Sequence, residues 1–333
     1  ALVIGVYQIF HASINLVTYV LYRKNKIRPR FRLLLDGLVL VFLGGTSLLS
    51  STGNSVFQLF VLGAYFFLYG LSNIRDGFLF EEEIGKNHLK RRVRMSLPIV
   101  LAALIPARTL AKINKFMLEN ADEREDIHLG MVKSGKTAEL EIFVHTAETS
   151  LFSAIGHVDI CYQGRVISYG NYDPSSETLF GMVGDGVLYF CDRDKYIDLC
   201  KRESQKTLFG YGIDLTPEME KAVQKKLAEL KQLTIPWEPS ADKIMTGDGK
   251  EDYTYAYKIR HETDGELYKF IKSKFKSYFV LSTNCVLLAD TIVGQAGTDI
   301  LSPKGFIAPG TYQAYLNREF EKPNSIVVSK HVY

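Results

Sequence analysis

Cysteine is scarce in this chain. Its 333 residues include four cysteines, Cys161, Cys191, Cys200 and Cys285, and no two of them form a CxxC pair. That number is too small for a disulfide scaffold in a chain of this length, although a Cys191–Cys200 bridge is left open. The fold is therefore not expected to depend on a disulfide framework.

A strong excess of charge is also missing, since the formal net charge is only +3 at pH 7. The sequence contains no zinc-finger spacing, no aromatic RNA-binding signature and no phosphate-loop motif of the form GxxxxGK[ST]. It shows neither an internal repeat nor a low-complexity tract. These absences exclude nucleic-acid binding and leave ATP or GTP chemistry without support.

Long apolar runs are present, and they gather in the first third of the chain. Three of them, Leu2–Tyr22, Leu33–Ser50 and Val56–Ile74, are each about 18–21 residues long, which suits a hydrocarbon layer of about 30 Å. A further segment, Met95–Leu118, contains two prolines and either crosses the membrane or lies along its surface. Residues 1–118 are therefore expected to form a membrane module of three to four helical spans.

Basic residues set the expected orientation of this module. They occur between the first two spans, from Arg23 to Arg32, and after the third span, from Arg75 to Arg94, whereas the second junction, Ser51–Ser55, is neutral. If Met95–Leu118 crosses, the C-terminal domain lies outside the cell; if it lies in the interface, that domain is cytoplasmic. Crossing is favoured, so we expect an integral protein of a bacterial cell membrane with its C-terminal domain outside.

Residues 119–138 read as a linker that opens with the charged run Glu119–Asp126. The remainder, residues 139–333, has the mixed pattern of an α+β domain, with a hairpin turn expected at Gln163-Gly164 and a capped helix start at Thr216-Pro217. Strands are expected over residues 139–145, 157–162, 165–170, 185–190, 207–213 and 253–259, and helices over 216–233, over 266–276 and from residue 285 onward.

Cys285 has the most informative surroundings. It follows Asn284 at the start of the apolar run Val286–Val293, so the sequence places its thiol in the first turn of a helix. Unpaired backbone N–H groups and the helix dipole at such a position favour a thiolate and can form an oxyanion hole. A lone cysteine is more often a small buried hydrophobe, so catalysis also requires a base, and His157 and the competing His145 are the candidates.

The Asn284-Cys285 helix start, preceded by a histidine-bearing hairpin over residues 156–170, resembles the circularly permuted papain-like enzymes of the NlpC and lecithin–retinol acyltransferase type. The resemblance covers about residues 139–320 and implies an α+β domain with an antiparallel sheet. It implies Cys285 as the nucleophile, His157 as the base and Ser168 as the residue that orients the imidazole. Asn284 is expected to support the helix start or the oxyanion. Many relatives carry His, Asn or an acidic group where Ser168 stands, and Asn171 and Asp173 are close substitutes.

The chemistry implied is attack of the Cys285 thiolate on an ester or amide carbonyl to give an acyl-thioester, without a metal or an organic cofactor. Water resolves the intermediate in a hydrolase, and an amine or hydroxyl resolves it in an acyltransferase. Anchoring at a bilayer raises the effective concentration of lipid-linked substrates, which favours a lipid or lipoprotein. A cell-wall peptide amidase or endopeptidase, and a non-catalytic membrane interaction protein, are the alternatives.

Overall fold

The computed structural model describes residues 2–28, 30–49, 131–133, 138–145, 157–204, 208–245, 251–294, 309–323 and 325–333, with isolated positions between them. The chain divides into two compact units, Ala1–Asn87 and His88–Tyr333. The expected spans 56–74 and 95–118, and most of the expected linker 119–138, lie outside the described residues.

In the first unit, helix α1 (Leu2–Lys24) packs against helix α2 (Phe31–Leu49). Glycines permit this close approach: a Cβ at Gly37 would lie 2.8 Å from the side chain of Leu16, below any ordinary contact distance. This pair of helices is therefore packed through small residues.

Among the described residues, one helix is long and apolar enough to cross a membrane, and it is α2. The expectation of a module with three to four spans is therefore not supported by this part of the chain. Helix α1 is long, but polar side chains interrupt its apolar run, among them Gln8 and His11. The sequence predicted a membrane span at Leu2–Tyr22 because this segment is long and apolar on average.

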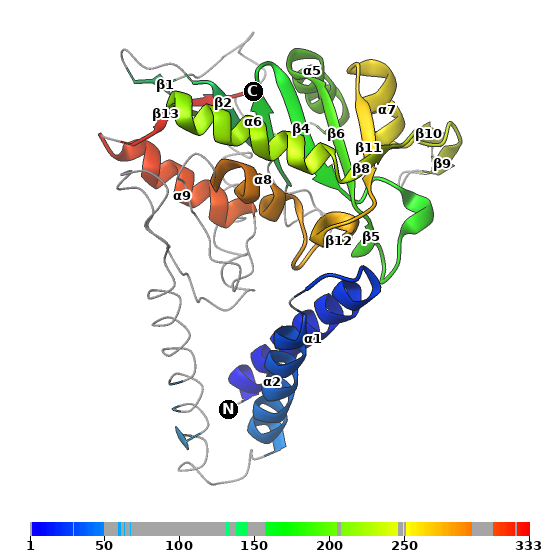
Figure 1. Ribbon diagram of the computed structural model, residues 1–333, viewed down its shortest axis with the longest axis vertical. Coiled ribbons are helices and arrows are strands. Elements are labelled where there is room, and N and C mark those ends of the chain that lie inside the picture. Colours follow the sequence, from blue (N-terminus) through cyan, green and yellow to red (C-terminus); the bar gives the residue numbers. More distant parts are fainter. Residues whose placement is uncertain are drawn as a thin grey trace. The chain divides into compact units, whose positions relative to one another are not determined.

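The second unit is a mixed α+β domain built on an antiparallel nine-stranded sheet, with the strand order β1-β13-β7-β2-β3-β4-β6-β11-β8 (Figure 1). This confirms the predicted α+β class with an antiparallel sheet. Its strands are β1 (Met131–Val132), β2 (Leu140–His145), β3 (His157–Tyr162), β4 (Arg165–Gly170), β6 (Val187–Asp192), β7 (Leu208–Ile213), β8 (Thr234–Pro236), β11 (Glu266–Phe270) and β13 (Val327–Val332).

Two small ribbons accompany the sheet, β5 (Val183–Asp185) paired with β12 (Ser277–Phe279), and β9 (Lys243–Met245) paired with β10 (Glu251–Tyr253). The helices of this unit are α5 (Arg193–Ser204), α6 (Pro217–Lys231), α7 (Tyr255–Glu262), α8 (Cys285–Val293) and α9 (Pro309–Glu321), with short 3₁₀ turns η3 (Pro174–Ser176) and η4 (Lys274–Lys276). Strand β1 falls within the residues expected to form the linker and pairs with β13.

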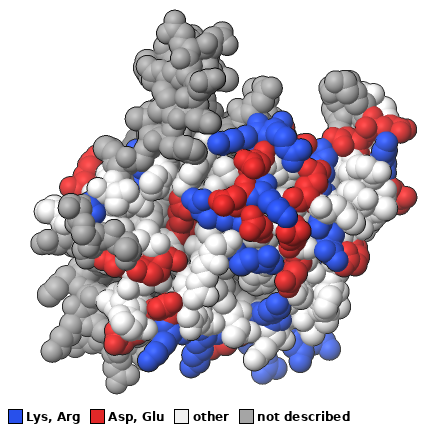
Figure 2. Space-filling view, turned by 90° about the horizontal axis from the view of Figure 1, so that it is seen from above, with Lys and Arg blue, Asp and Glu red and all other residues white. Residues whose placement is uncertain are grey.

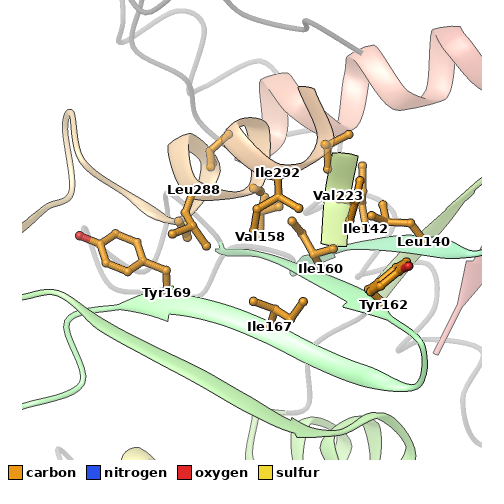
Figure 3. Packing of buried hydrophobic residues seen from close by; sticks show 14 of the residues in the cluster. Leu140, Ile142, Val158, Ile160, Tyr162, Ile167, Tyr169, Val223, Leu288 and Ile292 are labelled. Atoms are coloured by element: carbon orange, nitrogen blue, oxygen red, sulfur yellow. The ribbon is translucent and has the colours of Figure 1, made fainter. Parts of the chain in front are cut away.

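Helices cover both faces of the sheet, and side chains alternate between the faces along each strand. On one face, Val158 and Ile160 of β3 belong to a core that α6, α8 and α9 complete, and Figure 3 shows Leu288 and Ile292 of α8 directed at these strand residues. The opposite face carries a second core, in which Phe143, Cys161 and Val166 pack with α5 and α7. The helix that begins with Cys285 is thus held against the strand that carries His157.

Two of the expected elements have the opposite secondary structure. Residues 253–259 were expected to be a strand, but helix α7 begins there, with the Thr254 side chain accepting a hydrogen bond from Tyr257 N at 3.2 Å as its N-cap. Residues 266–276 were expected to be a helix, but Glu266–Phe270 forms β11 between β6 and β8. Pairing with two neighbours outweighs the local helix preference of this lysine-containing segment.

The face shown in Figure 2 carries interspersed Lys/Arg and Asp/Glu side chains rather than a field of one sign. The described surface also carries exposed ion pairs, for example Arg165 with Glu266 and Arg260 with Glu238. Exposed pairs of this kind contribute about 0–1 kcal/mol each. They therefore add solubility more than stability.

Candidate active site

Cys285 is the first residue of α8, and Asn284 is the cap of that helix. The Asn284 side-chain oxygen accepts from Leu287 N at 3.1 Å, and its Nδ2 donates to Val280 O at 3.0 Å. Capping of this kind stabilises a helix start by about 1 kcal/mol. Asn284 therefore serves the helix start, one of the two roles expected of it, and its amide contributes to holding the buried Cys285 in place.

His157 opens strand β3, and the nearby Cys285 sulfur contributes to raising the pKa of its imidazole. Its Nε2 atom lies near three oxygens: Asp159 Oδ1 at 2.8 Å, Ser168 Oγ at 2.9 Å and Tyr172 Oη at 3.0 Å. Because Nε2 is occupied in this way, Nδ1 is the nitrogen left for the thiol. Nε2 is thus the nitrogen of the imidazole that faces the carboxylate.

Asp159 is almost fully buried, with 1 % of its surface exposed. Its Oδ2 accepts from Tyr196 Oη at 2.5 Å and lies 2.7 Å from His145 Nε2. Its Oδ1 contacts His157 as a close ion pair rather than an aligned hydrogen bond, since Nε2–H is directed among the Ser168 and Tyr172 oxygens. Burial alone raises the pKa of this carboxyl, but attraction to His157 and the hydrogen bond with His145 bring it far below its usual range.

Burial by itself lowers the pKa of His157, yet the Asp159 carboxylate and the Cys285 sulfur, through charge and hydrogen bonds, raise that pKa well above its ordinary value. The imidazole is therefore protonated at neutral pH. An imidazolium beside a thiolate is the reactive form of a cysteine–histidine pair.

The structure places Ser168 Oγ in contact with the His157 imidazole, whose pKa the nearby Cys285 sulfur helps to raise. Asn171 lies just beyond β4, where its Nδ2 donates to Gly181 O at 3.4 Å. Asp173 caps the 3₁₀ turn η3 and forms an ion pair with Lys269. These two expected substitutes for Ser168 are thus engaged elsewhere.

Sequence reasoning missed three residues of this cluster: Asp159 as the partner of His157, and the tyrosines Tyr172 and Tyr196. A signal for Asp159 was available, because residues two apart on a strand share a face. Tyr172 reaches Nε2 because its ring folds back over Gly170, where a Cβ would lie 2.6 Å from the ring. The sequence spacing does not indicate that the Tyr172 ring folds back in this way. Tyr196 lies on helix α5, which is distant from His157 in the chain.

A third tyrosine, Tyr278 on β12, lies near the nucleophile. Burial and the negative charge of Cys285 raise the pKa of its hydroxyl well above the ordinary value. The hydroxyl therefore stays protonated, so it can act as a hydrogen-bond donor to an anion that forms beside the sulfur.

The remaining three cysteines lie in the core and are free thiols, so the Cys191–Cys200 bridge left open by the sequence is not formed. Burial is the main cause that raises the pKa of the Cys161 thiol to about 12, and it also raises that of Cys191. Such thiols are inert at neutral pH.

No group of three or more His, Cys, Asp or Glu side chains suited to a metal ion occurs within the described part of the chain. Comparisons with protein-family models, with curated proteins and with solved structures find no match for this chain. The geometry of the site is therefore the basis on which its function is inferred.

Proposed function

We propose that this protein is a membrane-anchored thiol acyltransferase or hydrolase of the permuted papain-like class, which acts on an ester or amide of a lipid or lipoprotein. The observation that carries the proposal is the arrangement of Cys285 at a capped helix start beside His157, whose far nitrogen faces the buried Asp159 carboxylate. Nucleophile, base and orienting group stand in the order that acyl transfer through a thioester requires.

In the proposed reaction, the Cys285 thiolate attacks the substrate carbonyl carbon and forms a C–S bond. The electron pair of the carbonyl moves to oxygen, for which the Cys285 backbone N–H at the helix start and the Tyr278 hydroxyl are the proposed donors. His157 gives its proton to the leaving oxygen or nitrogen as that bond breaks. It then accepts a proton from water, an amine or a hydroxyl, which takes the acyl group and releases the thiolate.

A lipid substrate is supported first by α2, the candidate membrane span, which would anchor the domain at a bilayer. The bacterial cell membrane, with the C-terminal domain outside, remains part of this proposal. The second support is a strained turn in which Leu179 and Phe180 both have positive φ, 50° and 57°, at a cost of about 1–2 kcal/mol each. This turn leaves Phe180 92 % exposed.

The turn is coupled to the segment that carries the nucleophile. Val280 N donates to Met182 O at 3.0 Å, and β5 pairs with β12 at Val183 and Phe279. Asn284 in turn donates to Val280 O. An exposed aromatic tip at this position is suited to contact the acyl chain or the bilayer from which the substrate is drawn.

The acyl-enzyme itself provides the main test. The detergent-solubilised protein is incubated with an activated p-nitrophenyl acyl ester, and intact mass is measured with peptide mapping. We expect one acyl group on Cys285, none in Cys285→Ala, and unchanged labelling in the control Cys161→Ala, because the thiol of Cys161 is buried and protonated. Equal labelling of the wild type and Cys285→Ala would overturn the proposal and favour the non-catalytic interaction protein.

The exposed turn gives a separate expectation about the substrate. Phe180→Ser should lower acyl-enzyme formation from a long-chain ester embedded in vesicles about three- to tenfold, because an apolar membrane contact is lost. The rate with a short, water-soluble ester should not change. Met245→Ser, which alters a 66 % exposed side chain on β9, serves as the matched control. An equal loss with both esters would contradict a role in lipid contact.

A further inference from the structure

The carboxylate beside His157 is shared with a second histidine. His145 closes strand β2 directly opposite His157 of β3 in the register of the sheet, and the two ring centroids are 5.6 Å apart. His145 is buried, with 7 % of its surface exposed, and its Nε2 lies 2.7 Å from Asp159 Oδ2. We infer that His145 is a positioning residue that fixes the Asp159 carboxylate against His157, an inference that rests on the proposed function.

The contacts divide the two oxygens of Asp159 between two tasks. Oδ2 accepts from His145 Nε2 and from Tyr196 Oη, which also lies 3.1 Å from His145 Nε2. Oδ1 is left for the ion pair with His157 Nε2. Donors on Oδ2 hold the plane of the carboxylate, so Oδ1 cannot rotate away from the imidazole.

His145 is not placed to act as the base itself. The interaction with Cys285 is made by His157, and the Nε2 atom of His145 is directed at Asp159. His145 thus influences the sulfur through Asp159 and His157. The two histidines considered as the base from the sequence therefore have different roles: His157 is the proposed base, and His145 positions the carboxylate beside it.

Loss of this donor has a definite electrostatic consequence. A carboxylate that loses this donor can turn its Oδ1 away from Nε2, so it stabilises the His157 imidazolium less, and the thiolate–imidazolium pair is then less populated at low pH. The other titratable groups around the carboxylate are phenols that burial keeps protonated, Tyr172, Tyr189, Tyr196 and Tyr255, so their charge does not change in this pH range.

Alkylation of Cys285 by iodoacetamide, followed by peptide mapping from pH 4.5 to 10, measures this pair without any substrate. Near pH 5 we expect Cys285 in His145→Ala to react about three- to tenfold more slowly than in the wild type. The two rates should converge near pH 9–10, where the thiolate forms without the imidazolium. His145→Gln retains a neutral N–H donor and should restore most of the low-pH rate, whereas Tyr196→Phe should shift the profile in the same direction as His145→Ala.

If the role of His145 were purely structural, His145→Ala would affect the folding of the domain. The pH profile of Cys285 alkylation would then show no shift that His145→Gln reverses. An unchanged profile in folded His145→Ala, or failure of folded His145→Gln to recover, would overturn the inference. If His145→Ala does not fold, Tyr196→Phe and His145→Gln decide the question. Ordinary thiol reactivity of wild-type Cys285 would instead count against the proposed function, so the two failures are distinguishable.

Discussion

Replacing His157 by glutamine is expected to slow acyl-enzyme formation about 10⁴-fold, the scale on which removal of a general base acts in cysteine and serine enzymes. Glutamine fills a similar volume and keeps a polar end, but it neither takes the thiol proton nor carries the positive charge that stabilises the thiolate. Stopped-flow release of p-nitrophenol from the activated ester gives the rate, and intact mass confirms the site of acylation.

The control for this change is His261→Gln on α7, whose imidazole stacks on Tyr257 with ring centroids 4.2 Å apart and faces solvent. That variant should retain the wild-type rate within about twofold. A small effect of His157→Gln combined with a large effect of His145→Gln would reverse the roles of the two histidines and return His145 to the position of base.

Local signals were sufficient to predict the elements that hold the nucleophile and the base. The turn Gln163-Gly164 has φ of 50° and 73°, the two positive values that a two-residue hairpin needs, and glycine supplies the second without strain. Thr216 caps α6 as expected, and Asn284 caps α8. In each case the turn conformation or the capping hydrogen bond involves residues only a few positions apart in the chain, so the local sequence was enough to predict it.

The orienting carboxylate could be placed on a strand face but not assigned a role. Which oxygen approaches Nε2 is decided by His145 on β2 and Tyr196 on α5, which lie 14 and 37 residues from Asp159 in the chain. Long-range contacts of this kind leave no spacing in a single sequence. Resemblance to a known family directed attention to the next strand, at Ser168, which is indeed in contact but shares Nε2 with the carboxylate.

Aromatic patterning misled the prediction for residues 253–259. Alternating tyrosines suggested a strand, yet Tyr253 and Tyr257 are four residues apart and stack at 4.2 Å, and His261 continues the same row along α7. The tyrosines of this segment thus fit both the two-residue period of a strand and the four-residue spacing of a helix. The cap at Thr254 is the feature that selects the helix.

Asp159→Asn is expected to lower kcat for acyl transfer about 10³–10⁴-fold, since the change keeps the size of the side chain but removes the charge that orients and stabilises the imidazolium. The sign of the accompanying pH effect follows from the contacts. Attraction to Asp159 raises the pKa of His157, so its loss lowers that pKa, and the alkaline limb of activity should move to lower pH.

Ser168→Ala is the informative comparison for that variant. The hydroxyl lies 2.9 Å from Nε2, as near as the carboxylate, but it is neutral, and Tyr172 remains as a second donor or acceptor at 3.0 Å. We therefore expect Ser168→Ala to cost no more than about tenfold in kcat and to leave the alkaline limb in place, because a neutral hydrogen bond contributes about 1 kcal/mol. The opposite order, with Ser168→Ala more damaging than Asp159→Asn, would assign the orienting role to the residue that family resemblance selects. The ratio of the two effects thus measures how far this site relies on charge rather than on a polar hydrogen bond to orient its base.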